Sequence, residues 1–302
     1  MGRIADALRR AEQDRRQAAG LTAAASAGPA VAELPGVATV EPPPADDETD
    51  ATDVPLAVVQ GLSESLVPFY ERFSLVTEQY RALRTRILSG NPNYEHRTYA
   101  ITSAVPKEGK SVTALNLGCI LAEVRHLRVV VVDADFRRGS LAHMLNQPPG
   151  PGLAELLDGQ ATYEQVLRNT PIPNLRFVPA GDTRGRSAAE LLASARARPT
   201  LRHLQNEFHY TIVDTPPATT VTDVGIIGQL CTGVVVVVRL HRTDEAAAKR
   251  CVRLLQVNNV PIVGCLLIGR DAPGGRYGYG YGYDYYRYYD YYMKSGEGRG
   301  KE

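Results

Sequence analysis

The sequence predicts a doubly wound α/β domain, in which a mostly parallel sheet carries helices on both faces. Uniformly apolar runs such as "VVVVDAD" and "GVVVVV" are typical of strands that are buried on both faces. Segments of helical periodicity separate these runs, and this alternation favours parallel pairing. With 302 residues and 44% hydrophobic content, the chain can form one domain of ordinary to large size with appendages.

The elements follow in order from an expected helix in "SLVTEQYRALRTRILSG", residues 74–90, where apolar residues recur at three- and four-residue spacing. Gly90 marks the end of this helix. Beyond it we expect strands at 98–105, 127–135, 175–181, 210–217, 233–240 and 261–269. The helices expected between them cover 110–124, 153–159, 188–197, 200–208 and 244–258.

The regions that flank this domain differ from it in composition. Residues 1–18 place small apolar side chains and arginines at helical spacing, which indicates a short amphipathic helix. Residues 19–67 are rich in alanine, proline and acidic residues and are expected to form a disordered linker. We therefore expect the folded domain at 68–272, followed by a flexible tail at 273–302 that carries a tyrosine cluster.

Composition disfavours several classes of protein. The formal net charge of +1 gives no argument for nucleic acid as a partner. The N-terminus lacks the apolar region of a secretory signal, and no apolar run reaches the roughly 18 residues of a membrane span. The four single cysteines, Cys119, Cys231, Cys251 and Cys265, are expected to be buried free thiols in a reducing cytoplasm.

The first expected strand-to-helix turn carries the sequence "AVPKEGKSV". Its Gly109, Lys110 and Ser111 lie where a phosphate-binding loop belongs, between an apolar strand and a helix. Unpaired backbone N–H groups at a helix N-terminus lie at the positive end of the helix dipole and bind phosphates. We expect Lys110 to reach the β- and γ-phosphates and Ser111 to ligate Mg²⁺. The residues expected to bind the nucleotide are Pro106, Lys107, Glu108, Gly109, Lys110, Ser111 and Val112.

Three aspartates follow two other expected strands. Asp133 and Asp135 end "VVVVDAD", and Asp214 ends "TIVD". In open α/β sheets the ligand crevice lies beyond the carboxyl ends of the strands, so these side chains should converge there. Converging carboxylates repel one another unless a cation lies among them. A single aspartate often caps the turn that follows it, but three beside Gly-Lys-Ser indicate a Mg²⁺–nucleotide site.

Taken together, "SAVPKEGKS", "VVVVDADFRR", "TIVDTPP" and the terminal tyrosine cluster resemble the bacterial tyrosine kinases of capsule and exopolysaccharide synthesis. In that family the three segments are a Walker A loop, a second Walker A-like strand and a Walker B strand. The segment "EQYRALRTRI" is similar to the family's oligomerisation helix through Glu78, Arg81 and Arg84. The resemblance covers most of the chain, about residues 70–292.

The resemblance implies a P-loop NTPase fold and an ATP- and Mg²⁺-dependent protein-tyrosine kinase that regulates polymerisation or export of a surface polysaccharide. It implies that Lys110, Asp133 and Asp135 are catalytic, with Asp133 accepting the tyrosine proton, and that phosphoryl transfer depends mainly on positioning and charge neutralisation. Ser111, Asp135 and Asp214 would hold the metal. The substrate would be the chain's own tail, at Tyr277, Tyr279, Tyr281, Tyr283, Tyr285, Tyr286, Tyr288, Tyr289, Tyr291 and Tyr292.

The resemblance also implies partners and a location. The chain would form a homo-oligomeric ring through Glu78, Arg81 and Arg84, with each tail phosphorylated in trans by the next subunit. A separate membrane chain-length regulator, a polysaccharide co-polymerase, would activate it, and a cognate tyrosine phosphatase would reverse the modification. The expected location is the cytoplasm, with recruitment to the inner face of the plasma membrane by the activator.

Three positions depart from the family's pattern. Ala104 stands where the full phosphate-loop pattern has its first glycine. Lys107 lies where relatives often carry glycine, which adds a cation near the phosphates and is expected to stiffen the loop. Ile268 replaces an asparagine that relatives often use against the adenine.

Two alternative functions remain open from the sequence. A partitioning or division-site ATPase shares the phosphate loop and would act as a positioning switch, but Val105 occupies the position of its signature lysine. A non-catalytic scaffold would bind nucleotide and use the Gly/Tyr-rich tail for self-association. Detection of phosphorylated tyrosine would distinguish a kinase from both of these alternatives.

Overall fold

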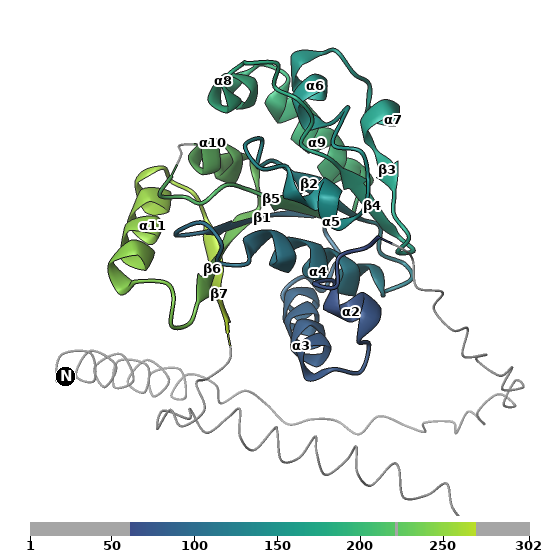
Figure 1. Cartoon of the computed structure of the whole chain (residues 1–302), viewed down its shortest axis with the longest axis vertical. Helices are drawn as coiled ribbons and strands as arrows, with labels where there is room; N and C mark the ends of the chain where they lie inside the picture. Colours follow the sequence, from purple (N-terminus) through teal and green to yellow (C-terminus); the bar gives the residue numbers. More distant parts are fainter. Residues whose placement is uncertain (1–60, 221–222, 270–302) are drawn as a thin grey trace, which may run out of the picture. The chain divides into compact units, whose positions relative to one another are not determined.

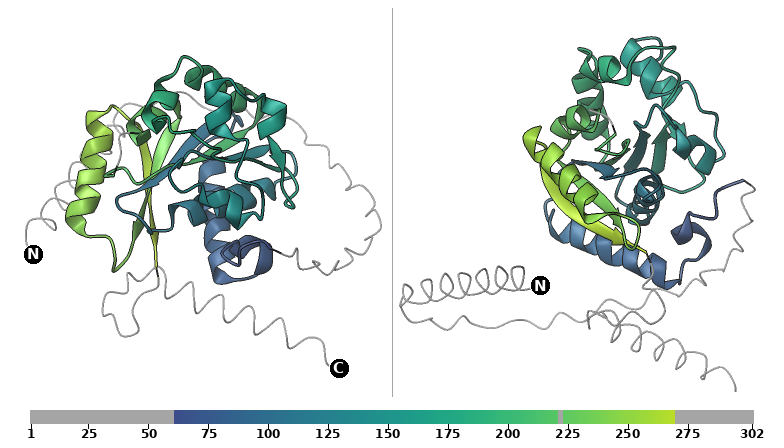
Figure 2. Two further views of the ribbon diagram at one scale, coloured as in Figure 1. Left: turned by 45° about the horizontal axis from the view of Figure 1, so that its top comes forward. Right: turned by 60° about the vertical axis from the view of Figure 1, so that its left-hand side comes forward.

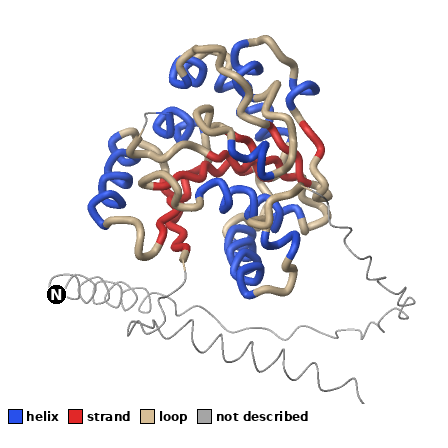
Figure 3. The backbone as a smooth tube through the Cα atoms, viewed as in Figure 1, coloured by secondary structure: helices blue, strands red, loops and turns tan. Residues whose placement is uncertain are grey.

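The structure, a computed structural model, describes residues 61–220 and 223–269. These residues form a seven-stranded sheet of order β3-β4-β2-β5-β1-β6-β7 (Figure 1). Every neighbouring pair is parallel except β3 and β4. The sheet forms one layer between helices (Figure 3), which confirms the doubly wound, mostly parallel α/β fold expected from the sequence.

The strands lie close to where the apolar runs predict them. Their bounds are β1 Arg97–Ser103, β2 Val129–Asp133, β3 Arg168–Asn169, β4 Leu175–Val178, β5 Tyr210–Asp214, β6 Gly233–Arg239 and β7 Ile262–Ile268. Every residue of β2 and β5 is buried, as their uniformly apolar sequences require. The sequence analysis did not anticipate β3, because two residues are too few to show a period of two.

The helices fill the connections between the strands. Their bounds are α2 Val67–Tyr70, α3 Leu75–Ser89, α4 Lys110–Ala122, α5 Ser140–Met144, α6 Leu153–Asp158, α7 Tyr163–Val166, α8 Ala188–Ala193, α9 Ala197–Glu207, α10 Asp223–Leu230 and α11 Glu245–Val257. The sequence analysis missed α2, α5 and α7, which are too short for a helical period, and α10, which contains Gly225 and Gly228.

The two faces of the sheet carry separate hydrophobic cores. Val129 and Val131 of β2 pack in the core beneath α4, whereas Val130 and Val132 pack in the core that involves α8–α11. This alternation is the period of two of a β-strand. Figure 2 shows α3 and α4 on one side of the sheet and α11 on the other. Because helices cover both faces of the sheet, a ligand can reach only the ends of the strands.

The packed part of the chain begins earlier than expected. Leu62 and Leu66 are buried against α4, and the backbone N–H of Ser63 donates to the carbonyl of Met144 at 2.9 Å. The linker expected to run to residue 67 is therefore too long, because an average over composition hid these two leucines. The expected helix at 1–18, the rest of the linker to residue 60 and the tyrosine tail lie outside the described residues.

The cysteine expectation holds at three positions and is wrong at one. Cys119, Cys231 and Cys251 are buried free thiols, and burial raises the pKa of the first two to about 12. Cys265 is also free but exposed, because β7 is the edge strand of the sheet.

No helix in the described part of the chain is long and apolar enough to cross a membrane.

Candidate nucleotide site

The phosphate loop connects the central strand β1 to α4. Gly109 caps α4 with φ of 88°, and no side chain accepts a hydrogen bond from the N–H groups of the first turn. Those donors face outward at the positive end of the helix dipole, as an anion site requires. Pro106 is exposed, whereas Val112 is half-buried within the first turn of α4.

Lys107 has φ of 66°, in the left-handed region that favours glycine. A glycine would adopt this conformation without the steric penalty that a Cβ atom causes. The exposed ammonium group of Lys107 remains available to an anion at the loop.

Lys110 contacts Asp135, which follows β2, and Asp214, which ends β5. Its Nζ lies 2.8 Å from Asp135 Oδ2, 3.5 Å from Asp214 Oδ1 and 3.2 Å from Ser111 Oγ. Burial alone would lower the pKa of Lys110, but the neighbouring carboxylates of Asp214 and Asp135 raise it above its ordinary value. Lys110 is therefore a buried, charged ammonium group at the start of α4, where the sequence predicts it.

Asp214 has a carboxylate oxygen that is free to bind a ligand. Oδ1 faces Lys110, but the fully buried Oδ2 has no hydrogen-bond partner in the structure. Burial raises the pKa of Asp214 to about 6, although Lys110 and a hydrogen bond with Ser111 act in the opposite direction. An orphaned buried carboxylate oxygen beside a serine hydroxyl matches the oxygen ligands that Mg²⁺ prefers. The residues Ser111, Asp135 and Asp214 thus fit the metal that the sequence predicts.

Asp133 pairs in register with Asp214 across β2 and β5, so both carboxylates lie at the same edge of the sheet. Its Oδ1 accepts the N–H of Asp135 at 3.1 Å, and Oδ2 accepts the N–H of Leu141 at 3.0 Å. Burial and the charge of Asp214 raise the pKa of Asp133 to about 8 despite these two donors. The two N–H groups fix the orientation of the carboxylate, and each oxygen keeps a second lone pair.

The side chain of Glu108 does not face the nucleotide-binding surface of the loop. It is fully buried and accepts hydrogen bonds from the N–H of Val105 and the hydroxyl of Thr243. The backbone of Glu108 remains available for phosphate binding, and its expected part in binding the nucleotide stays a prediction. Ile268 lies close to the same loop. A Cβ atom added at Gly109 would lie 2.5 Å from Cδ1 of Ile268.

The expected oligomerisation residues contact one another and a residue that the sequence analysis missed. Arg81 binds Glu78 at 2.5 Å and Glu123 at 3.0 Å, and Arg84 binds Glu123 at 2.6 Å. Arg84 also donates to the carbonyl of Ile120 at 3.1 Å. Glu123 is the C-cap of α4. The sequence does show that Glu123 lies at the end of the helix that begins with Lys110. Its pairing with Arg81 and Arg84 depends, however, on a contact between segments that are distant in the chain.

Asp223 is a second residue that sequence reasoning missed. It opens α10 and is buried, as are Val224 and Ile227 of the same helix. Burial raises the pKa of its carboxyl, while the charge of Arg137 acts in the opposite direction. Because the charge of Asp135 also acts on it, Asp223 belongs to the electrostatic surroundings of the site.

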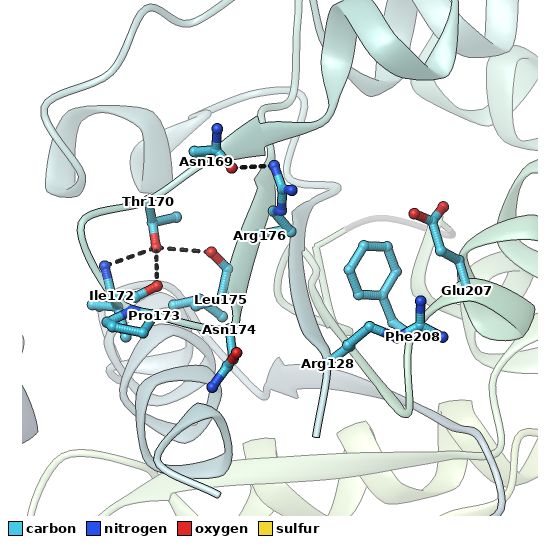
Figure 4. Close-up of a pocket in the computed structure, with 10 residues that line it drawn as sticks. All are labelled: Arg128, Asn169, Thr170, Ile172, Pro173, Asn174, Leu175, Arg176, Glu207 and Phe208. Atoms are coloured by element: carbon cyan, nitrogen blue, oxygen red, sulfur yellow. Dashed lines mark hydrogen bonds between the residues drawn. The ribbon is translucent and has the colours of Figure 1, made fainter. Parts of the chain in front are cut away.

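A separate cavity of about 430 Å³ lies near the amino ends of β2 and β4 (Figure 4). Arg128, which precedes β2, and Arg176 of β4 line it together with Glu207 and Phe208 at the end of α9. Since the phosphate loop lies at the carboxyl ends of the strands, this cavity is not part of the nucleotide site. Its mixture of opposite charges favours no single class of ligand.

Several known proteins are similar to this chain, although no family model matches it. The tyrosine-protein kinase ptk of Acinetobacter johnsonii is 35% identical over 197 residues, which are 64% of this chain and 26% of ptk. The succinoglycan biosynthesis transport protein ExoP of Rhizobium meliloti is 31% identical over 175 residues, 57% of this chain and 22% of ExoP. The chain thus spans about a quarter of the length of these two relatives.

Two further proteins match over most of their own length. The BceF tyrosine kinase domain, a solved structure, has a TM-score of 0.62 and 31% sequence identity, covering 68% of this chain and 81% of that one. The tyrosine-protein kinase CpsD of Streptococcus agalactiae is 31% identical over 194 residues, 63% of this chain and 82% of CpsD. With the phosphate loop and both aspartate-bearing strands in place, this chain belongs to the bacterial tyrosine-protein kinase family.

Proposed function

We propose that this chain is an ATP-dependent protein-tyrosine kinase that phosphorylates its own C-terminal tyrosine cluster and thereby regulates polymerisation or export of a capsular or exopolysaccharide. The observation that carries the proposal is the contact of Lys110 with Asp135 and Asp214 beside Ser111. Membership of the tyrosine kinase family supports the choice of tyrosine, and the similarity to ExoP supports the link to a polysaccharide.

The residues of the site have separate roles in this proposal. The N–H groups at the start of α4 bind the phosphates of ATP, and Lys110 turns from the aspartates toward the transferred phosphoryl group. Ser111, Asp135 and Asp214 hold Mg²⁺, which neutralises negative charge on the phosphates. Asp133, held by two backbone N–H groups, accepts the proton of the incoming tyrosine hydroxyl.

Phosphorylation takes place in trans within a ring of identical chains. Glu78, Arg81 and Arg84 pair neighbouring subunits, and the tail of one subunit enters the site of the next. Each phosphate adds about −1.5 to −2 charge at neutral pH. A tail phosphorylated at several positions therefore repels its neighbours, which loosens the ring until a tyrosine phosphatase resets it.

A separate membrane protein of the chain-length regulator class activates the kinase and recruits it to the inner face of the plasma membrane. The activator's cytoplasmic segment is the part that meets the kinase, so it is sufficient for an assay in solution.

Transfer of labelled phosphate tests the proposal. The purified chain is incubated with radiolabelled ATP and Mg²⁺, alone and with the cytoplasmic segment of a candidate activator, and phosphotyrosine is identified after hydrolysis. We expect label on tyrosine with the parent chain and none with Lys110→Met. Label that persists in Lys110→Met, or hydrolysis of ATP without labelled tyrosine, contradicts the proposal; the second result favours a positioning ATPase.

The matched control is Lys249→Met, which removes an exposed lysine that pairs with Glu245 on α11. It makes the same chemical change at an exposed position outside the phosphate loop and should transfer phosphate like the parent. Replacing the ten tail tyrosines with phenylalanine should remove the label while leaving ATP binding unchanged.

A further inference from the structure

Glu108 places a carboxylate inside the loop that binds anions. Its side chain is 0% exposed, and no lysine, arginine or histidine of the described residues forms an ion pair with it. A buried carboxylate is costly unless its oxygens accept hydrogen bonds. Here Oε2 accepts the N–H of Val105 at 2.9 Å, and Oε1 accepts the hydroxyl of Thr243.

Thr243 belongs to the segment between β6 and α11, 135 residues away along the chain. Its Oγ1 also accepts the N–H of Arg239 at 2.8 Å, so the hydroxyl is oriented with its proton toward Glu108. Arg239 Nη1 in turn donates to the carbonyl of Lys107 at 3.3 Å. The end of β6 therefore holds the phosphate loop through two neighbouring residues, Lys107 and Glu108.

The loop needs such support because its backbone is strained. Lys107 has a left-handed φ of 66°, whereas the φ of 88° at Gly109 causes no strain because glycine has no Cβ atom. A non-glycine residue in this region persists only where surrounding contacts hold it. The contacts that hold it here come from Glu108 and from the end of β6.

We propose that Glu108 is a positioning residue, which together with Thr243 holds the phosphate loop in its ATP-binding conformation before ATP arrives. This inference rests on the proposed function, since it takes the loop to bind ATP. A buried carboxylate close to bound phosphates would by itself weaken their binding, so its role is to hold the loop rather than to contact the ligand. Prior ordering of a binding loop raises affinity by removing the cost of ordering it on binding.

The proposal predicts an effect on ATP binding rather than on the chemical step. Loss of the hydrogen bond between Thr243 and the carboxylate should weaken MgATP binding about tenfold, the usual scale for a bond to a charged group. Because the bound loop adopts the same conformation once ATP fills it, kcat at saturating ATP should change by less than about twofold.

The test compares Thr243→Val, which has the same shape but no hydroxyl, with Thr243→Ser, which keeps the hydroxyl. MgATP affinity is measured by titration with a fluorescent ATP analogue, and folding of the nucleotide-free chain is followed by thermal unfolding. We expect the valine variant to lose about tenfold in affinity and the serine variant to bind within about threefold of the parent. Thr183→Val makes the same substitution outside the loop, at a hydroxyl with no hydrogen bond among the described residues, and should match the parent.

Glu108→Gln gives an independent measurement if the valine variant does not fold. The glutamine can still accept the N–H of Val105, but its amide group offers no acceptor to the Thr243 hydroxyl. Affinity should fall, and amide exchange of the loop should become faster in the nucleotide-free chain. Equal MgATP affinity in Thr243→Val and the parent, or a loss shared by Thr243→Ser, overturns the proposal. So does a fall in kcat at saturation without a change in affinity.

The same titration separates this inference from the proposed function. A parent chain that binds MgATP but never labels tyrosine refutes the kinase proposal and leaves the role of Glu108 intact. A parent chain that does not bind MgATP refutes both.

Discussion

Arg84 of α3 binds Glu123 at the end of α4 at 2.6 Å, and Arg81 binds the same carboxylate at 3.0 Å. Both arginines that are expected to pair with a neighbouring subunit are thus already paired within the chain. In the ring that we propose, each arginine would therefore exchange an internal partner for an external one. The free energy gained on assembly would then be the difference between the external and the internal ion pairs, rather than the free energy of a newly formed pair.

Replacing Arg81 and Arg84 together with alanine should leave the chain unable to form a ring, because the side chains that meet the neighbour are gone.

Glu123→Gln should act in the opposite direction and favour the ring at lower protein concentration, since the arginines are released. Exposed ion pairs contribute about 0.2–1 kcal/mol each, so the shift should be a few-fold. Light scattering over a concentration series measures both effects. Glu95→Gln, which removes another exposed carboxylate paired with an arginine, is the control; weaker assembly of Glu123→Gln would show that Glu123 itself belongs to the ring interface.

Lys110→Met should destabilise the nucleotide-free chain as well as abolish phosphate transfer. It leaves Asp135 and Asp214 buried without their cation, and breaking a buried ion pair costs about 3–5 kcal/mol. Denaturant unfolding measures the change. Lys110→Met combined with Asp135→Asn should recover part of the loss, because one of the uncompensated charges is removed. An unchanged unfolding midpoint in Lys110→Met would mean that these side chains are not paired in solution.

Lys107→Gly should stabilise the chain, since glycine adopts the left-handed conformation of this position without a steric penalty. Relief of the strain exceeds the extra chain entropy of glycine by about 0.5–1 kcal/mol. A change of that size raises Tm by a few degrees at most, about 2–4 °C per kcal/mol. Lys107→Ala keeps the Cβ atom and removes only the charge, so it should not be stabilised. Equal Tm values for the two variants would contradict the strain argument.

The contribution of His209 to the stability of the nucleotide-free chain should fall as the pH is lowered below about 6.5, the ordinary pKa of histidine. Burial lowers the pKa of His209, and the charges of His96, Arg128 and His126 lower it further. At this site the folded chain binds fewer protons than the unfolded one, so acid favours unfolding, whereas the raised pKa values of Asp133 and Asp214 act in the opposite direction. His209 Nδ1 faces the N–H of Arg128 at 3.0 Å, an interaction that His209→Asn can retain.

His209→Asn should gain stability relative to the parent as the pH is lowered from 7 to 5, as measured by denaturant unfolding of both chains at each pH. His143→Gln removes an exposed histidine of α5 and should follow the parent. An identical pH dependence of the parent and His209→Asn would rule out His209 as the source.

The fold and the centre of the site follow from local patterns in the sequence. The apolar runs that become β2 and β5 end at Asp133 and Asp214, and parallel pairing then brings these ends to one edge. The Gly-Lys-Ser segment marks the start of α4 by itself. These features are readable because each depends on residues close together in the chain.

The remaining features depend on contacts between distant segments. Arg81 and Glu123 are 42 residues apart, and Glu108 and Thr243 are 135 residues apart. Nothing next to Glu123 or Thr243 distinguishes them from ordinary surface residues, so only the folded chain identifies their partners. The short helices α5 and α10 were missed for a related reason, because tertiary packing rather than a long amphipathic pattern stabilises them.

Helix α4 has 13 residues, with Lys110 and Ser111 in its first turn and Glu123 as its cap. At about 1.5 Å per residue the helix is roughly 20 Å long. In the function that we propose, one end of the helix binds phosphates, while the other end contacts the arginines of α3. If ATP displaced α4, the contacts of Glu123 with Arg81 and Arg84 would change. By thermodynamic reciprocity, a neighbouring subunit that binds those arginines would then change the affinity for ATP by the same factor.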